Sequence, residues 1–241
     1  MKRLTLIMLF SVTVALSATG QVAMQDTAFS DFYEEWIVDR LELGIRFVHF
    51  GFTDAEEQMF DGGGTFIGGF TEGISIDALE EKQDYMPVFY ARWWFHEYFG
   101  IELGWERLEG ETDTYWDGHT DGNLFAYGPT LLLVGSYRMQ DYPAQPYAGL
   151  GVAYLFADFD DDPWDEGIHN IKVDDTTAFL AEAGCTFDVY KNLKADLALR
   201  YMWAEVDSEF YLQYGEVKTN QRSWAFPIDN WAVQLGLLYA F

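Results

Sequence analysis

The chain ends with the stretch Trp231-Ala232-Val233-Gln234-Leu235-Gly236-Leu237-Leu238-Tyr239-Ala240-Phe241. A large apolar side chain occupies every second position from Trp231 to Phe241, and the positions between them are mostly small or polar. Alternation with a period of two predicts a β-strand with one apolar face. Because that face continues to an aromatic last residue, the pattern favours a lipid-facing strand of a membrane barrel over a half-buried strand of a soluble protein.

The same alternation recurs in seven other stretches of the chain. They lie at residues 41–47, 88–95, 101–107, 124–137, 147–156, 179–187 and 195–203. An even number of strands is what a closed single-chain bacterial barrel requires. We therefore predict an all-β fold, a closed antiparallel up-and-down transmembrane β-barrel of about eight strands that occupies residues 35–241.

The first twenty residues have the three parts of a cleaved signal peptide. Lys2 and Arg3 precede an apolar run, and the small residues Ser17-Ala18-Thr19-Gly20 follow it. The apolar run is too short for a membrane-spanning helix, which needs roughly 20 residues. We predict a signal peptide at residues 1–20 and an N-terminal periplasmic segment at residues 21–34.

The connections between the predicted strands alternate in length. Residues 51–85, 109–122, 157–175 and 204–228 form long, acidic, glycine-containing segments, whereas the three connections between them are short. In outer-membrane barrels the short turns are periplasmic and the long loops are extracellular. This predicts a protein of the cell outer membrane with both termini in the periplasm.

At this point the chain resembles a known family, the OmpA/OmpX-type eight-stranded outer-membrane barrels, also described as porin-like. The resemblance rests on Gly100-Ile101-Glu102-Leu103-Gly104-Trp105, on Pro146-Tyr147-Ala148-Gly149-Leu150-Gly151-Val152 and on the closing Tyr239-Ala240-Phe241. It implies that the barrel-assembly machinery inserts the chain and reads Trp231, Tyr239 and Phe241 as its assembly signal. The resemblance implies no ligand.

If the apolar faces meet lipid, the opposite faces fill the lumen, and their charged residues nearly balance. Four basic residues oppose five acidic ones: Arg40, Arg46, Arg92 and Arg200 against Glu42, Glu102, Glu106, Glu182 and Asp196. Eight strands leave an interior just wide enough for side chains. Because unpaired charges are costly in such a space, we predict a paired charge network that closes the lumen.

Aromatic residues are frequent, at 18% of the chain, which suits a membrane barrel with a ring of them at each interface. The predicted register puts one ring at the short-turn rim and one at the opposite rim. The first contains Trp93, Phe95, Tyr98, Phe99, Tyr142, Tyr147, Tyr190, Tyr239 and Phe241, and the second Phe47, Trp105, Tyr154, Tyr201 and Trp203.

The net charge of −26 makes nucleic acid an unlikely class of partner, so we expect none. Cofactors and catalysis are not expected either, because the four histidines are dispersed and no serine lies in a nucleophile elbow. Asp158, Asp160 and Asp162 imitate the first positions of a calcium loop, but Pro163 replaces its required glycine. Weak bridging by divalent cations, or a plain solvated acidic loop, is the expectation there.

Three functions fit these observations. The first is a non-enzymatic barrel in outer-membrane lipid that contributes to envelope integrity or to surface interaction through its acidic extracellular loops. The second is a narrow channel for small or cationic solutes, and the third is a soluble periplasmic ligand-binding barrel.

Overall fold

The computed structural model describes residues 34, 36–38, 40–53, 79–81, 87–113, 120–137, 143–161, 169–214 and 217–241. Its contacts divide the chain into Met1–Val38 and Asp39–Phe241, and the described strands lie in the second unit. The predicted signal peptide lies outside the described residues, as does the predicted segment 21–34 except for Glu34. Among the described residues, no helix has both the length and the hydropathy to cross a membrane.

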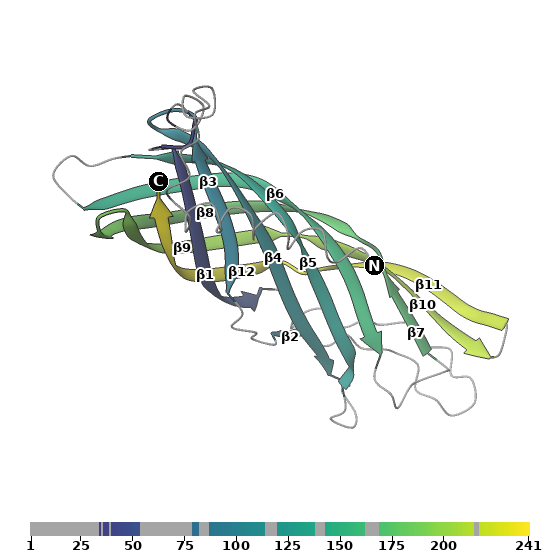
Figure 1. Cartoon of the computed structure of the whole chain (residues 1–241). Coiled ribbons are helices and arrows are strands. Elements are labelled where there is room, and N and C mark those ends of the chain that lie inside the picture. Colours follow the sequence, from purple (N-terminus) through teal and green to yellow (C-terminus); the bar gives the residue numbers. More distant parts are fainter. Residues whose placement is uncertain are drawn as a thin grey trace, which may run out of the picture. The chain divides into compact units, whose positions relative to one another are not determined.

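Eight antiparallel strands close into a barrel, as predicted (Figure 1). Neighbouring strands pair in the order β3–β1–β12–β9–β8–β6–β5–β4, and β4 also pairs with β3, which completes the circle. Their bounds are β1 Leu41–Phe52, β3 Val88–Trp94, β4 Phe99–Asp113, β5 Thr120–Ser136, β6 Ala144–Asp161, β8 Thr176–Tyr190, β9 Leu193–Trp203 and β12 Asn230–Ala240.

The circle closes where the last strand meets the first. β1 and β12 pair from Glu42 opposite Ala240 to Phe52 opposite Asn230. Beyond the end of β12, the Phe241 amide donates a hydrogen bond of 3.1 Å to the Leu41 carbonyl. No sheet edge is left at this seam, so the backbone groups of both strands are satisfied within the barrel wall.

Two of the predicted long loops contain strands instead, which corrects the prediction for residues 157–175 and 204–228. β7 (His169–Val173), β10 (Glu205–Tyr214) and β11 (Val217–Pro227) form a three-stranded sheet in the order β11–β10–β7. One residue separates β9 from β10, and two residues separate β11 from β12. The outer face of β10 is charged at Glu205 and Asp207, so the described part of this strand lacks the apolar face by which the other strands were recognised.

The barrel strands also continue into the other predicted loops. β4 extends to Asp113 and β5 begins at Thr120, so most of the predicted loop 109–122 is strand. In the predicted loop 51–85, β2 (Leu79–Glu81) pairs with the far part of β4. The barrel wall is therefore taller at the end with the long connections than the apolar pattern indicates.

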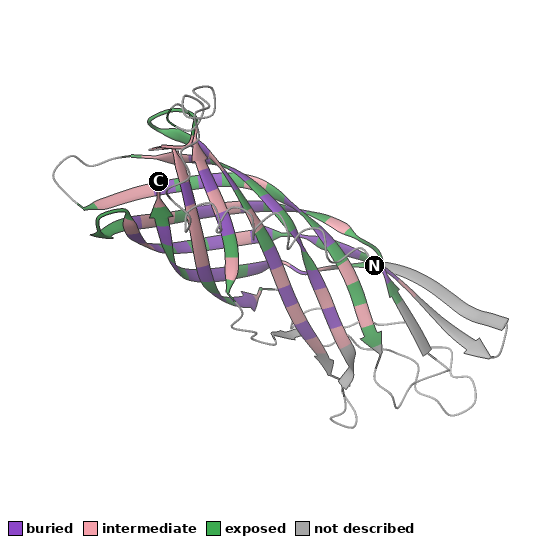
Figure 2. Ribbon diagram, viewed as in Figure 1, coloured by how far each residue is buried: buried purple, intermediate pink, exposed green. Residues whose placement is uncertain are grey.

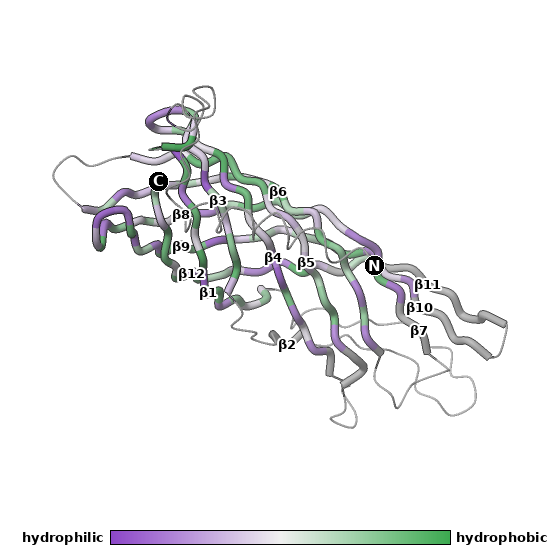
Figure 3. Tube along the Cα trace, in the orientation of Figure 1, coloured by the Kyte–Doolittle hydropathy of each residue, from purple (hydrophilic) through white to green (hydrophobic). Residues whose placement is uncertain are grey.

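Burial alternates residue by residue along the barrel strands, as the bands in Figure 2 show. On the outer face Leu150 is 70% exposed and Leu235 is 60% exposed, whereas the alternate positions Ala153 and Gln234 are about 1% exposed. Figure 3 shows that the barrel strands carry both hydrophobic and hydrophilic segments. The exposed apolar face is the surface expected to meet lipid, and the buried face lines the lumen.

Candidate functional site

The lumen near the short-turn end of the barrel contains a cluster of buried charged side chains. Eight of the nine residues predicted to form a lumen network are no more than 6% exposed: Glu42, Arg46, Arg92, Glu102, Glu106, Glu182, Asp196 and Arg200. Each lies at a position whose side chain points into the lumen, because successive side chains of a strand point to opposite faces.

Arg46 of β1 lies at the centre of this cluster. Its Nη1 donates to Glu102 Oε1 at 2.7 Å, and its Nε donates to Asp196 Oδ2 at 2.8 Å. Its Nη2 lies 3.2 Å from Glu182 Oε1. The three carboxylates come from β4, β8 and β9, and none of these strands pairs with β1. One guanidinium therefore links strands across the lumen.

A second group of ion pairs joins the first through Glu102. Arg92 of β3 donates from Nη2 to Glu102 Oε2 at 2.6 Å, so Glu102 binds two arginines. Arg92 Nη1 also lies 3.9 Å from Glu42 Oε2, and Lys194 donates to Glu42 Oε1 at 2.6 Å. Arg200 and Glu106 form a separate ion pair, in which Arg200 Nη2 lies 2.5 Å from Glu106 Oε2. The charges thus form one connected chain and one additional pair.

Two tyrosines belong to the network although the sequence did not indicate them. The Tyr90 hydroxyl donates to Asp196 Oδ2 at 2.7 Å, and the Tyr147 hydroxyl donates to Asp196 Oδ1 at 2.9 Å. The Arg46 guanidinium lies 3.8 Å from the Tyr90 ring centroid, and the Arg92 guanidinium lies 4.2 Å from that of Tyr147. These cation–π contacts cover the faces of both guanidinium groups that hydrogen bonds do not reach.

The placement of Tyr147 corrects the prediction that put it in the aromatic ring at the barrel rim. It is 5% exposed, because its register position alternates with the lipid-facing Ala148. The alternation of side chains along β6 therefore places Tyr147 in the lumen, although its aromatic character suggested the rim. The same rule, applied to Phe89 and Ala91, would have found Tyr90.

Arg40 does not join the network, which corrects its predicted position. It lies in a turn before β1 begins, so the alternation of that strand does not govern its side chain, and it is only partly buried. Among the described residues, no ion pair involves it. Lys194, which the prediction omitted, is buried at 8% and supplies the fourth positive charge. The network thus still has four basic and five acidic side chains, with Lys194 in place of Arg40.

The rest of the lumen, toward the long-connection end, is mostly apolar, although Ser208 and Asn230 are buried there too. Its side chains are 9% exposed or less: Val48, Phe50, Leu108, Leu124, Ala126, Ala153, Leu155, Ala178, Leu180, Met202, Ala204, Val206, Ile228 and Ala232. Leu155 and Val206 have no exposed surface. The lumen is therefore filled by two kinds of packing, ionic at one end and apolar at the other.

The residues of the predicted assembly signal lie on or near the outer face. Trp231 is 37% exposed and Tyr239 is 48% exposed, and Phe241 is partly buried. The rings of Tyr239 and Phe241 pack edge to face with centroids 5.2 Å apart. Trp231 packs in the same way on His49 of β1, 5.9 Å away. Both contacts lie along or beside the β1–β12 pair.

Of the candidate calcium ligands, Asp158 and Asp160 are exposed on β6, and Asp162 lies outside the described residues. Asp158 Oδ1 accepts a hydrogen bond from the amide of its neighbour Phe159, as in a solvated side chain. Across the described ranges, no group of three or more histidine, cysteine or acidic side chains has a metal-binding arrangement.

Comparison with solved structures shows the fold. The chain is similar to the outer membrane protein OprG from Pseudomonas aeruginosa, with 17% identity and a TM-score of 0.59, over 85% of this chain and 97% of that one. It is similar to AlkL, determined in DMPC lipid bilayers, with 14% identity and a TM-score of 0.58, over 86% and 92%. It is similar to the outer membrane protein W of E. coli, with 14% identity and a TM-score of 0.51, over 85% of this chain and 99% of that one.

Comparison with family profiles gives the family. Residues 83–241, which include seven of the eight barrel strands, match the OmpW family. No curated protein sequence matches the chain. The resemblance to OmpA/OmpX-type barrels thus named a neighbouring family, because alternation and an aromatic end are shared by small outer-membrane barrels in general. The chain belongs to the OmpW family and is an outer-membrane β-barrel.

Proposed function

We propose that this protein is a non-enzymatic, non-conducting barrel of the outer membrane, which contributes to envelope integrity or to surface interaction through acidic extracellular segments. The observation that supports it best is Arg46, whose guanidinium binds carboxylates from three strands across the lumen. The alternative of a soluble periplasmic ligand-binding barrel does not stand, because the family is one of outer-membrane proteins.

The energetics of the network support a closed lumen. Opening a water path would separate Arg46 and Arg92 from Glu102, and each pair is less than 5% exposed. Breaking a buried ion pair leaves an uncompensated charge, which costs about 3–5 kcal/mol unless water replaces the partner. In a lumen of eight strands there is little room for that water. The network therefore holds the lumen closed at this end.

We also propose that the short-turn end faces the periplasm, together with both termini, so that β7, β10 and β11 lie outside the cell. Outer-membrane barrels combine short periplasmic turns with longer extracellular segments. At the long-connection end several acidic residues are exposed, including Asp160, Asp175, Glu205 and Asp207. Lys172, an exposed base in this region, donates a hydrogen bond of 2.8 Å to Asp174. Such a surface favours divalent cations or basic partners over anionic ones.

Labelling of single cysteines tests this orientation. The one native cysteine, Cys185, is first replaced by serine, and Asp160→Cys and Glu97→Cys are then made separately. A membrane-impermeant maleimide added to intact cells is expected to label Asp160→Cys at least tenfold more than Glu97→Cys, since Glu97 lies in a short turn. After cell lysis both should react equally. Preferential labelling of Glu97→Cys in intact cells would reverse the proposed topology.

The experiment for the closed lumen is conductance across planar bilayers. The refolded protein is expected to give no large, stable single channels. The double variant Arg46→Ala with Glu102→Ala should conduct, because it removes the two side chains that link β1 with β4. A matched double change in the apolar half, Leu155→Ala with Val206→Ala, should not. Large, stable channels from the unmodified protein would favour the alternative of a narrow channel for small or cationic solutes.

For biogenesis we propose that a signal peptide at residues 1–20 directs export, and that the barrel-assembly machinery recognises Trp231, Tyr239 and Phe241. The support is their position: the exposed rings lie on the strand that completes the circle. The machinery would thus contact the outer face of the chain's last strand before that strand pairs with β1.

A further inference from the structure

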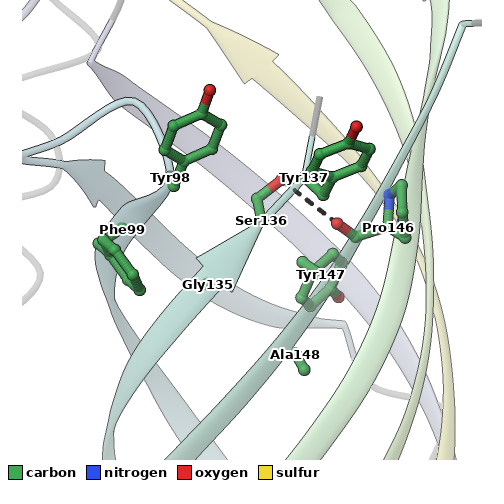
Figure 4. Close-up of a pocket in the computed structure, with 8 residues that line it drawn as sticks. All are labelled: Tyr98, Phe99, Gly135, Ser136, Tyr137, Pro146, Tyr147 and Ala148. Atoms are coloured by element: carbon green, nitrogen blue, oxygen red, sulfur yellow. Dashed lines mark hydrogen bonds between the residues drawn. The ribbon is translucent and has the colours of Figure 1, made fainter. Parts of the chain in front are cut away.

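An open groove interrupts the lipid-facing surface at the short-turn end of the barrel, between β4, β5 and β6. It has a volume of about 490 Å³ and is lined by Tyr98, Phe99, Gly135, Ser136, Tyr137, Pro146, Tyr147 and Ala148 (Figure 4). Small-molecule sites in proteins occupy roughly 300–1,000 Å³. The groove is therefore large enough for part of a small amphiphile.

The groove exists because small residues lie between large ones on the same face. Gly135 pairs with Phe99 on one side and with Ala148 on the other, so these three positions form one row across three strands. In the next row along the strands, Leu133 is 57% exposed and Leu150 is 70% exposed. The missing side chain of Gly135 and the short one of Ala148 therefore make the floor of a depression beside projecting leucines.

Backbone hydrogen bonds fix the walls of the groove. The Ser136 amide donates to the Tyr98 carbonyl at 2.9 Å, and the Tyr137 amide donates to the Pro146 carbonyl at 3.0 Å. These bonds hold the ends of β4, β5 and β6 at a constant separation. A ligand would enter a preformed site, so little ordering of the protein would oppose binding.

The chemistry of the groove is that of an amphiphile with one polar end. Tyr98 is 40% exposed and Tyr137 is 64% exposed, and in Figure 4 their hydroxyl groups extend to the same side, with Phe99, Gly135 and Ala148 away from it. Tyrosines at a membrane interface place the ring among acyl chains and the hydroxyl at the head groups. The floor is apolar, whereas the two hydroxyls are donors for ester or phosphate oxygens.

The geometry points to a binding site for a single diacyl phospholipid, with one acyl chain along Gly135 and Ala148 and its glycerol-ester region between Tyr98 and Tyr137. Lipid is the occupant because the groove is continuous with the exposed apolar face that includes Leu133 and Leu150, and that face is solvated by acyl chains. It lies at the short-turn end, which under the orientation proposed above is the periplasmic leaflet, where phospholipid is the bulk lipid.

The test uses a variant that fills the groove without a clash. A Cβ atom at Gly135 would meet no heavy atom closer than 3.7 Å, so Gly135→Leu can be accommodated and would occupy the depression. The control is Ala195→Leu, which introduces the same side chain at a small residue on the lipid face of β9, away from the groove. Heat-modifiable gel mobility confirms that each variant folds.

Each protein is reconstituted with phosphatidylethanolamine and phosphatidylglycerol, extracted in detergent and analysed by native mass spectrometry under conditions that remove loosely held lipid. The unmodified protein and Ala195→Leu are expected to retain one phospholipid mass, and Gly135→Leu should retain it at least fivefold less. Equal retention in all three, or none in the unmodified protein, would overturn the site. For protein isolated from native membranes, a lipopolysaccharide or peptide mass in place of the phospholipid would overturn the assignment of the ligand.

Discussion

The two halves of the lumen fill the same kind of space by different means. At the short-turn end, a directional bond of 2.7 Å joins Arg46 and Glu102; Arg46 contacts three carboxylates, and Glu102 binds two arginines. At the other end, Leu155 and Met202 belong to a cluster of buried apolar side chains, whose packing depends little on direction. The difference teaches that the ionic half specifies which strands face one another, whereas the apolar half supplies stability that tolerates substitution.

The largest expected effect comes from removing the centre of the ionic half. Arg46→Met leaves Glu102, Glu182 and Asp196 facing one another with no cation between them, and we expect a loss of about 3–5 kcal/mol in the free energy of unfolding. Urea unfolding in lipid vesicles measures it. Arg200→Met is the matched control, since Arg200 forms one ion pair, with Glu106, and it should lose less. Equal losses would show that Arg46 has no central role.

A smaller effect is expected when the apolar half is truncated. Leu155→Ala removes a fully buried side chain and leaves a cavity, so the free energy of unfolding should fall by about 2–4 kcal/mol. The same unfolding experiment applies, and Leu150→Ala, on the lipid face of the same strand, is the control. If Leu155→Ala also produced ion channels, the apolar half would take part in closing the lumen, and the distinction between the halves would fail.

Within the ionic half, the five carboxylates are not equally held. Glu182 has only longer contacts of 3.2 and 3.4 Å, both with Arg46, whereas Glu102 binds two arginines at 2.6 and 2.7 Å. Glu182→Gln also leaves four acidic against four basic side chains. We therefore expect it to change the free energy of unfolding by less than about 1 kcal/mol, and Glu102→Gln to cost about 2 kcal/mol more. The reverse order would contradict the proposed balance.

The smallest effect on stability is expected outside the lumen. Deleting Phe241 removes one backbone hydrogen bond to Leu41 and one ring contact, so the finished barrel should lose less than about 1 kcal/mol. Assembly should nevertheless slow several-fold, because the terminal ring is proposed as part of the assembly signal. Pulse-labelled cells, followed by the appearance of the heat-modifiable form, measure that rate. Equal rates for the deletion and the unmodified chain would remove Phe241 from the signal.

The sequence was sufficient for the barrel because lipid imposes alternation on each strand. It was insufficient where lipid is absent. β10 and β11 lie beyond the apolar band, and they were not predicted as strands because they carry charged residues in place of an apolar face. In the lumen, alternation predicted that Arg46 and Asp196 are buried, but it did not predict their partners. Strand tilt brings together side chains from strands that are not paired in the sheet. Alternation also failed for Arg40, because side chains in a turn do not alternate between two faces. It missed Lys194 because this residue precedes Ala195, the first apolar residue used to trace that strand.

The link between Arg46 and Asp196 joins positions 150 residues apart, and β1 pairs with the last strand of the chain. The first contact cannot form until β9 has been synthesised, and the second cannot form until β12 has been. Without β12, β1 and β9 would each present an unpaired edge. Contacts of such long sequence separation make folding slow and leave exposed edges prone to aggregation. We therefore expect the unfolded chain to need protection from aggregation until β12 is available to close the circle.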